Sequence, residues 1–316
     1  MSFGGFIDLH AHGIRGYDTR TADHEEILKI ADLYGSRGTR AMLLSVYPGT
    51  RDEMRRTMEA VRRAMEIQRR QTSSMQQSDH GGRATGKTGG GGSCRGYPPA
   101  LILGVHLEGP FLNPKRCGAL EKSRFVKPSV SFLKQLVAGY EEIVRTITIA
   151  PEMPRALTVI ERCSGMGIRV NMGHSDATLQ EAVRGKQAGA TGITHLFNAM
   201  RPFHHREPGL AGLGLIDEDL YTEVIADGVH IHAAVLALIF SVKRPDRIIL
   251  VSDSVESEKK KGMAVYRKKG VLAGSRATVS DSADLLKNIG IPEAAIIGAA
   301  RDNPGRYIGY PLPDHC

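Results

Sequence analysis

Residues 5–12 read Gly-Phe-Ile-Asp-Leu-His-Ala-His, a short apolar stretch that ends in two histidines. Seven further β-rich apolar stretches follow along the chain, at residues 40–46, 101–108, 144–150, 168–174, 191–197, 222–230 and 247–253. Strands that alternate with helical segments are typical of parallel sheets. We expect eight such units to close into an α/β barrel of the (β/α)8 TIM type, with residues 1–316 as a single domain.

The stretches between these strands carry apolar residues at helical spacing. In the first of them the pattern runs from Ile27 to Tyr34, and Gly35 or Gly38 can end the helix. Further helices are predicted at residues 51–70, 153–165, 178–188 and 232–241.

The composition limits the partners of the chain. Of 316 residues, 41% are hydrophobic and 24% are charged, as in an ordinary globular protein. The net charge of 42 − 34 = +8 arises mostly in residues 51–70, interpreted as a solvated helix face, and residues 256–269, interpreted as a loop. Aromatic residues make up only 5% and tryptophan is absent, so we expect no stacking platform for nucleic acid.

The N-terminus and the cysteines indicate the compartment. Residues 1–10 lack the cationic start and apolar core of a secretion signal, and the longest strongly apolar run, residues 233–240, is too short to cross a membrane. Four cysteines without a C-x-x-C pair are too few for a disulfide scaffold. The sequence therefore predicts a cytoplasmic protein without a membrane partner.

Residues 71–99 are rich in Ser, Gln and Gly and predict a flexible insertion. Within it, residues 81–88 (GGRATGKT) satisfy the phosphate-loop pattern G-x-x-x-x-G-K-T. That pattern binds phosphate only between a strand and a helix, because these aim the main-chain amides at the ligand. Here a polar stretch precedes it and four glycines follow, so nucleotide binding ranks last among the hypotheses.

Six of the eight predicted strands end in residues that can bind a metal ion or transfer a proton, at the end of a barrel where active sites lie. These residues are His10 with His12, Glu108, His174, His195, His230 and Asp253. His10 and His12 are two residues apart on one strand, so both imidazoles can point to the same side. For an isolated pair of this kind, a structural hydrogen bond at a strand end explains the pattern equally well.

Glu108 ends a strand of apolar residues, where a carboxylate is costly unless it is paired or coordinated. Together with His174 and His195 it offers one carboxylate and two imidazoles, the ligand set of a catalytic zinc-type site that keeps one position for water. Water held in this way becomes a nucleophile near neutral pH. His106, on the same side of the strand, fits a buried structural histidine better than a ligand.

Asp253 and His230 are the candidates for proton transfer and for activation of a carbonyl group. Asp253 ends the last predicted strand and could take a proton from water and deliver it to a leaving amine. His230 could polarise the scissile carbonyl and stabilise the oxyanion. An alternative role for Asp253 is the N-cap of a helix, a position that aspartate favours.

The chain resembles the N-acetylglucosamine-6-phosphate deacetylases of the amidohydrolase superfamily in a series of short motifs. They are GFIDLHAHG, HLEGPFLNP, TIAPE, GHSDAT, THLFNAM, HHREPG, IADGVHIH and LVSDS, with a weaker likeness in GVLAGSRATVSD and ARDNPGRYIG. HLEGP, THLFNAM and REPG rarely occur together by chance, so the set is specific. The resemblance implies hydrolysis of N-acetylglucosamine 6-phosphate or a related N-acyl amino sugar, with release of acetate.

The resemblance also implies a metal centre. Glu108, His174 and His195 would hold the principal divalent ion, commonly zinc. His10 and His12 would hold a second ion, which some members of the family lack.

The remaining roles follow from the same resemblance. Asp253 would be the general acid and base, and His230 would polarise the carbonyl. Asn198 and Ala199 would contact the phosphosugar, and Arg206 its phosphate, often across the interface of a homodimer. A planar guanidinium suits a phosphate group well.

Three features depart from the pattern of the family. Its members usually begin and end with the two halves of a small β-sandwich, whereas this sequence starts at the first barrel strand and stops at residue 316. Leu120 stands where the family generally has a substrate-contacting histidine, and because leucine cannot donate a hydrogen bond, another acylated amine could be the substrate. The insertion at residues 71–99 has no functional account.

Two other hypotheses stay open. A related amidohydrolase could act on a cyclic amide or a deaminable ring, although residues 145–149 (RTITI) offer no lysine for carbamylation. A non-catalytic barrel that binds a metal ion or a small ligand is the other. Release of acetate would separate the leading hypothesis from both.

Overall fold

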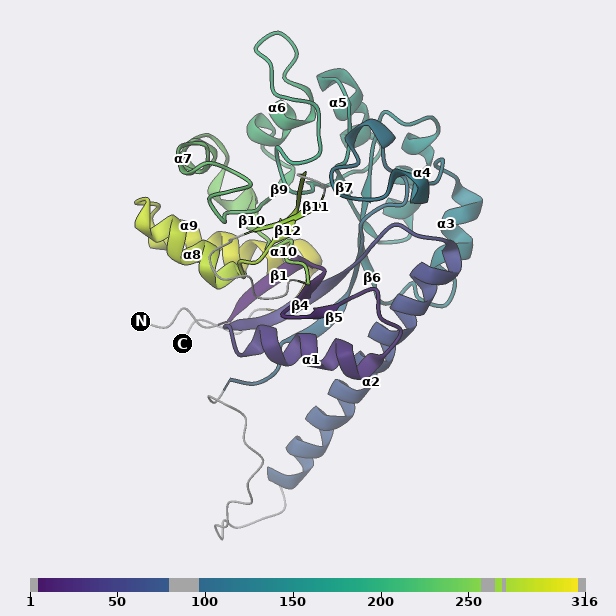
Figure 1. The fold of residues 1–316 in the computed structure, drawn as a ribbon. Helices are drawn as coiled ribbons and strands as arrows, with labels where there is room; N and C mark the ends of the chain where they lie inside the picture. The colour runs from purple at the N-terminus through teal and green to yellow at the C-terminus, as the bar shows by residue number, and fades with distance from the viewer. Residues whose placement is uncertain (1–4, 80–96, 257–264, 269–270, 312–316) are drawn as a thin grey trace.

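The computed structural model describes residues 5–79, 97–256, 265–268 and 271–311. Within them, eight parallel strands form one sheet in the order β1-β4-β5-β6-β7-β8-β9-β10 (Figure 1). The strands are β1 (Phe6–Ala11), β4 (Thr39–Val46), β5 (Leu101–Leu107), β6 (Val144–Ile149), β7 (Arg169–Met172), β8 (Gly192–Ile193), β9 (Tyr221–Val224) and β10 (Ile248–Leu250).

The sheet closes through the residues that follow β10. The main-chain amide of Asp253 donates to the oxygen of His10 at 2.8 Å, and the amide of His12 donates to the oxygen of Ser254, also at 2.8 Å. Ala11 and Ser254 form a parallel bridge. The predicted (β/α)8 TIM-type barrel is therefore confirmed, and its closure lies at the carboxyl ends of the strands.

Helices cover the outside of the strands, as Figure 1 shows. They are α1 (His24–Gly35), α2 (Arg51–Asp79), α3 (Val130–Val137), α4 (Ala156–Gly165), α5 (Leu179–Gln187), α6 (Gly209–Ile216) and α7 (Ala233–Val242). After β10 come the antiparallel pair β11 (Val265–Lys268) and β12 (Val271–Ser275), then α8 (Val279–Asn288), α9 (Glu293–Ile297) and α10 (Asn303–Ile308). A second small pair, β2 (Gly13–Ile14) and β3 (Tyr17–Asp18), follows β1.

Side-chain caps define where several helices begin. Asp23 accepts a hydrogen bond from the amide of Glu25 at the start of α1, and Ser129 caps α3 in a similar way. Thr178 and Thr278 form capping boxes at the starts of α5 and α8. These oxygens satisfy amides of the first turn, which have no partner inside the helix.

Two of the segments described differ from the sequence prediction, and a third cannot be compared with it. Helix α2 continues to Asp79 instead of ending at residue 70, so residues 71–79 of the predicted insertion are helical. The phosphate-loop stretch at residues 81–88 lies outside the described residues. Val265–Lys268, predicted as a loop, is a strand because its main chain pairs with β12.

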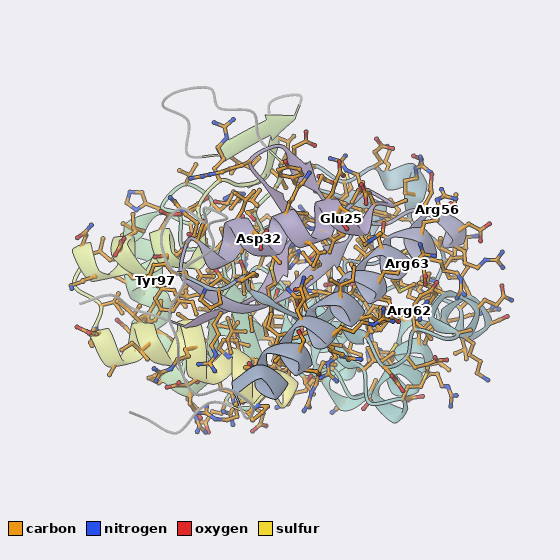
Figure 2. All side chains as sticks on the ribbon, turned by 90° about the horizontal axis from the view of Figure 1, so that it is seen from below. Glu25, Asp32, Arg56, Arg62, Arg63 and Tyr97 are labelled. Carbon is orange, nitrogen blue, oxygen red and sulfur yellow. The ribbon has the colours of Figure 1, made fainter. Side chains whose placement is uncertain are left out.

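The basic segment of α2 is a solvated helix face, as predicted. Figure 2 shows Arg56, Arg62 and Arg63 on α2, which lies beside α1. Arg62 pairs with Glu59 and Glu66, each at 2.9 Å, at spacings of three and four residues. Part of the local positive charge is therefore balanced along the helix itself.

The apolar core has two parts. The larger cluster fills the space between the strands and the surrounding helices. A smaller cluster joins Tyr307 and Ile308 of α10 to Ile7, Leu9, Ala41, Leu43, Ile225, Ile249 and Val251. Tyr307 also packs on Tyr221, the first residue of β9, so α10 lies at the end of the barrel where the strands begin, and the opposite end is left for polar groups. Over the described residues, no helix combines the length and apolar character that a membrane span requires.

Candidate metal centre

Glu108 lies immediately after β5 and is surrounded by imidazoles from other strands. Its Oε1 is 3.1 Å from Nε2 of His174 and 3.3 Å from Nε2 of His195. The two Nε2 atoms are 3.1 Å apart, and all three residues are buried. The three side chains predicted to converge therefore do so, from the ends of β5, β7 and β8.

The same carboxylate faces a second group of side chains. Oε2 of Glu108 is 3.2 Å from Nε2 of His12, and Oε1 is 3.5 Å from Nε2 of His10. Oδ1 of Asp253 lies 3.6 Å from Nε2 of His10 and 3.7 Å from Nε2 of His12. In each group, the potential ligand atoms lie within 4.8 Å of one another, and Glu108 belongs to both.

Left-handed backbone at three site residues turns their side chains into the pocket. His174, His195 and Asp253 have φ angles of 46°, 30° and 45°. This conformation is uncommon for residues other than glycine and costs about 1–3 kcal/mol each, so it persists only where the surroundings enforce it. His174 and His195 accordingly come two residues after their strands end, instead of within the strands as the sequence pattern suggested.

Charge pairing governs the protonation of the site. Burial lowers the pKa of His10, but hydrogen bonds to Glu108 and Glu223 outweigh it and hold the pKa well above its usual value. Burial raises the pKa of Glu108, but the surrounding histidines bring it well below its usual range. For His195, the pair with Glu108 likewise overcomes burial and raises the pKa. Glu108 is therefore a carboxylate, the form that coordinates a cation.

The donor set fits a divalent cation. Nδ1 of His174 lies 2.9 Å from the main-chain oxygen of Arg116, so this nitrogen is the donor and Nε2 carries the lone pair. That lone pair points at His195 and Glu108, where several acceptors meet within hydrogen-bond distance. Imidazoles and a carboxylate arranged in this way suit zinc and related ions.

His230 is held by a carboxylate that the sequence analysis did not identify. Its Nδ1 is 2.7 Å from Oδ2 of Asp227, which also accepts from Oγ of Ser275 at 2.9 Å. Burial raises the pKa of Asp227, but the hydrogen bonds from His230 lower it by more, so the pKa of Asp227 lies below its usual value. The signal lay in the motif Ala-Asp-Gly-Val-His, where a turn three residues long joins the two side chains. In contrast to the predicted strand at residues 222–230, β9 ends at Val224.

A pocket of about 250 Å³ opens above these groups. Asn198 and Ala199 line it, as do Leu120 and the apolar residues Val271 and Leu272 of β12. The other groups at its floor are His12, Glu108, His174, His195, His230 and Asp253. Four of the five predicted metal ligands therefore line one pocket with Asn198 and Ala199, whereas the fifth, His10, is fully buried and does not line it.

Arg206 lies apart from this pocket. Its side chain is exposed, and its Nη1 is 3.1 Å from Nε2 of the neighbouring His205. Two other residues adjoin the predicted metal ligands. The half-buried ring of Tyr47, which was not predicted, stacks on His12 with centroids 3.9 Å apart. His106 is bonded within the core, as predicted.

An eight-stranded parallel barrel with buried His, Glu and Asp clusters at its carboxyl end defines the amidohydrolase class of metal-dependent hydrolase folds. No family model matches the chain. It is 32% identical over 254 residues to the N-acetylglucosamine-6-phosphate deacetylase of Lysinibacillus sphaericus, which covers 80% of this chain and 58% of that protein. It is 34% identical over 230 residues to the N-acetylgalactosamine-6-phosphate deacetylase of Escherichia coli O157:H7, covering 68% of this chain and 61% of that protein.

The structure resembles the N-acetyl-D-glucosamine-6-phosphate deacetylase of Mycobacterium smegmatis, solved as a mutant in complex with N-acetyl-D-glucosamine-6-phosphate. The TM-score is 0.81 at 29% identity, over 98% of this chain and 78% of that one. The chain belongs to the N-acetylglucosamine-6-phosphate deacetylase family of the amidohydrolase superfamily. It spans less than two thirds of the length of the two curated relatives.

Proposed function

We propose that the chain hydrolyses the acetamide bond of N-acetylglucosamine 6-phosphate or of a related N-acyl amino sugar, releasing acetate and the free amine. The observation that carries this proposal is the position of Glu108. Its carboxylate faces two groups of metal-binding side chains at the floor of one pocket. The substrate class comes from the family to which the chain belongs.

In this proposal, Glu108, His174 and His195 hold the principal divalent ion, and His10 and His12 hold a second one. Zinc suits these donors. When bound, such an ion lowers the pKa of a coordinated water to near neutrality and polarises the carbonyl of the substrate.

Asp253 is the proposed general base and acid. It faces the pocket beside His10 and His12, and its side chain remains 16% exposed. As a carboxylate it accepts a proton from the attacking water, and it then returns that proton to the leaving nitrogen so that the amine departs neutral.

His230 is the proposed group that polarises the substrate carbonyl. Because the carboxylate of Asp227 can only accept, the Nδ1 of His230 carries a proton. With a proton on Nε2 as well, the ring can donate a hydrogen bond to the carbonyl oxygen of the substrate. The pair can therefore stabilise negative charge that develops on the carbonyl oxygen.

Asn198 and Ala199 are proposed to contact the sugar in the same pocket. Arg206 is too far out on its exposed loop to line the pocket of its own chain. We assign it to the phosphate bound by a second copy in a homodimer. Leu120 favours a second candidate, an N-acyl amine less polar than the sugar, because an apolar side chain borders the pocket at this point.

The test is incubation of purified, zinc-loaded protein with N-acetylglucosamine 6-phosphate, N-acetylgalactosamine 6-phosphate and a panel of apolar N-acetyl amines, with acetate measured as the product. We expect acetate from at least one phosphosugar and none after treatment with a chelator, with recovery on adding zinc. Full turnover by chelated protein would refute the mechanism. Phosphosugar binding without acetate release at saturating zinc would favour a non-catalytic barrel instead.

A further inference from the structure

One buried carboxylate below the candidate metal centre has no role in the proposed reaction. Glu223 lies on β9 and is only 1% exposed. A carboxylate enclosed so completely is costly unless hydrogen bonds compensate for the lost water. Its partners therefore indicate why the fold retains it.

Both carboxylate oxygens of Glu223 have partners. Oε1 accepts a hydrogen bond from Nδ2 of Asn171 at 2.7 Å, and Oε2 lies 3.4 Å from Nδ1 of His10. Asn171 accepts from the hydroxyl of Tyr307 on α10 at 2.5 Å, and this hydroxyl lies 3.0 Å from Oγ1 of Thr191. A continuous series of hydrogen bonds thus joins α10 to His10 through the interior of the barrel.

Glu223, His10 and His106 are close enough together to be considered as ligands of a further ion. The hydrogen bonds of His106 argue against this. Its Nδ1 lies 3.2 Å from the main-chain oxygen of Leu9, and its Nε2 lies 2.8 Å from Oγ1 of Thr148. Since both ring nitrogens are engaged, His106 has no lone pair to offer to an ion, and His10 is the histidine that Glu223 contacts.

We propose that Glu223 is a positioning residue that fixes the tautomer and the ring orientation of His10 for cation binding. A carboxylate can only accept, so Nδ1 of His10 keeps its proton, and a cation that displaces the proton of Nε2 would find the lone pair of that nitrogen facing the candidate metal centre. There, Nε2 lies 3.3 Å from Nε2 of His12 and 3.6 Å from Oδ1 of Asp253. This inference rests on the proposed function, because it presupposes a cation at the His10 and His12 end of the site.

Glu223→Gln tests this role with little change in volume. The glutamine can still accept from Asn171, but its amide then donates to Nδ1 of His10 and forces the proton onto Nε2, which removes the lone pair. Equilibrium dialysis against Zn²⁺ with elemental analysis should give two ions per chain for the wild type. In the variant, the second ion should bind about 10- to 100-fold more weakly. Unchanged affinity at both positions, or a single ion in the wild type, would overturn the inference.

A matched variant separates positioning from a general loosening of the core. Tyr307→Phe removes the far end of the hydrogen-bond series without touching His10, so both ions should bind with nearly wild-type affinity. A loss as large as that of Glu223→Gln would count against positioning.

A measurement on the wild type does not depend on whether the variants fold. Nitrogen-15 NMR of the zinc-loaded protein should show His10 protonated on Nδ1, and protonation on Nε2 would overturn the inference. If the wild type binds no zinc at all, the proposed function itself fails. If the wild type binds two ions and Glu223→Gln binds both with unchanged affinity, the proposed function is retained and only the role of Glu223 is refuted.

Discussion

The two ends of the barrel interior differ in chemistry although the same strands build both. At the end where the strands begin, Tyr307 of α10 packs on Tyr221, and Ile7, Leu43 and Ile249 join it in one apolar cluster. Within β1, Ile7 and Leu9 belong to this cluster, whereas His10 lies beside Glu108. Stability and chemistry therefore depend on residues at different heights along the same strands.

Charge at the site end is tolerated because it is paired. Glu108 contacts four imidazoles, and Glu223 ties His10 to the apolar end through Asn171. A substitution at the site end should therefore change catalysis more than folding. A substitution at the opposite end should change folding more than catalysis.

The largest effect is expected for Asp253→Asn at the site end. Asparagine tolerates the left-handed backbone at this position but cannot accept a proton from water. Acetate release should fall about 10²- to 10⁴-fold while the melting temperature stays close to that of the wild type. Asp246→Asn, just before the same strand and paired with Arg244 at the surface, is the control and should keep its activity. Wild-type turnover by Asp253→Asn would contradict the proposed role.

Leu43→Ala at the opposite end should reverse the outcome. Leu43 is fully buried in the apolar cluster, so its truncation leaves a cavity. The free energy of unfolding, measured with urea, should fall by about 2–5 kcal/mol. The turnover number per folded molecule should not change. The control Leu238→Ala, on the exposed face of α7, should lower the free energy of unfolding by no more than about 0.5 kcal/mol. A loss as large as that of Leu43→Ala would contradict the special role of the buried cluster.

The sequence predicted which strands exist better than where they end. Eight apolar stretches marked the eight strands, because parallel strands buried on both faces are apolar along their length. The ends were misplaced where the backbone turns into the left-handed region, as at His174 and His195, since nothing in the residue types signals that turn. Helix α2 runs past its predicted end because residues 71–79 contain neither glycine nor proline, the two residues that break helices most strongly.

The sequence also predicted only part of the candidate site. The groups that reach the pocket were found from their place at strand ends, as Glu108 and Asp253 illustrate. Asp227 and Glu223 were missed because they act on other side chains and not on the pocket. Tyr47 was missed because a single aromatic residue after a strand carries no distinctive pattern. Helices α3, α6, α8, α9 and α10 were not predicted either.

Lys243 is a buried cation whose hydrogen bond goes to a main-chain oxygen and not to a carboxylate. Lys243 is 2% exposed, its ammonium donates to the main-chain oxygen of Asp217, and burial lowers its pKa to about 8. Between that value and the ordinary 10.5, the unfolded chain binds more protons than the folded one, so stability rises with pH. Relative to Lys243→Met, the wild type should gain at most about 1.4 kcal/mol per pH unit across this window. Urea unfolding of both proteins at pH 7 and pH 10 measures the gain, and a constant difference would contradict it.

The smallest effect is expected at the rim of the pocket, where Leu120 presents an apolar side chain to the substrate space. Leu120→His would supply the hydrogen bond that the resemblance to the family implies, and a net hydrogen bond contributes about 0.5–1.5 kcal/mol. The kcat/KM for N-acetylglucosamine 6-phosphate should therefore rise about 3- to 10-fold, and Leu120→Met, which keeps the apolar surface, should change it little. If the histidine instead lowers kcat/KM for the phosphosugar, while the wild type turns over a less polar N-acyl amine faster, then Leu120 is a specificity residue for that other substrate. The metal centre would then be shared with the family and the substrate would not.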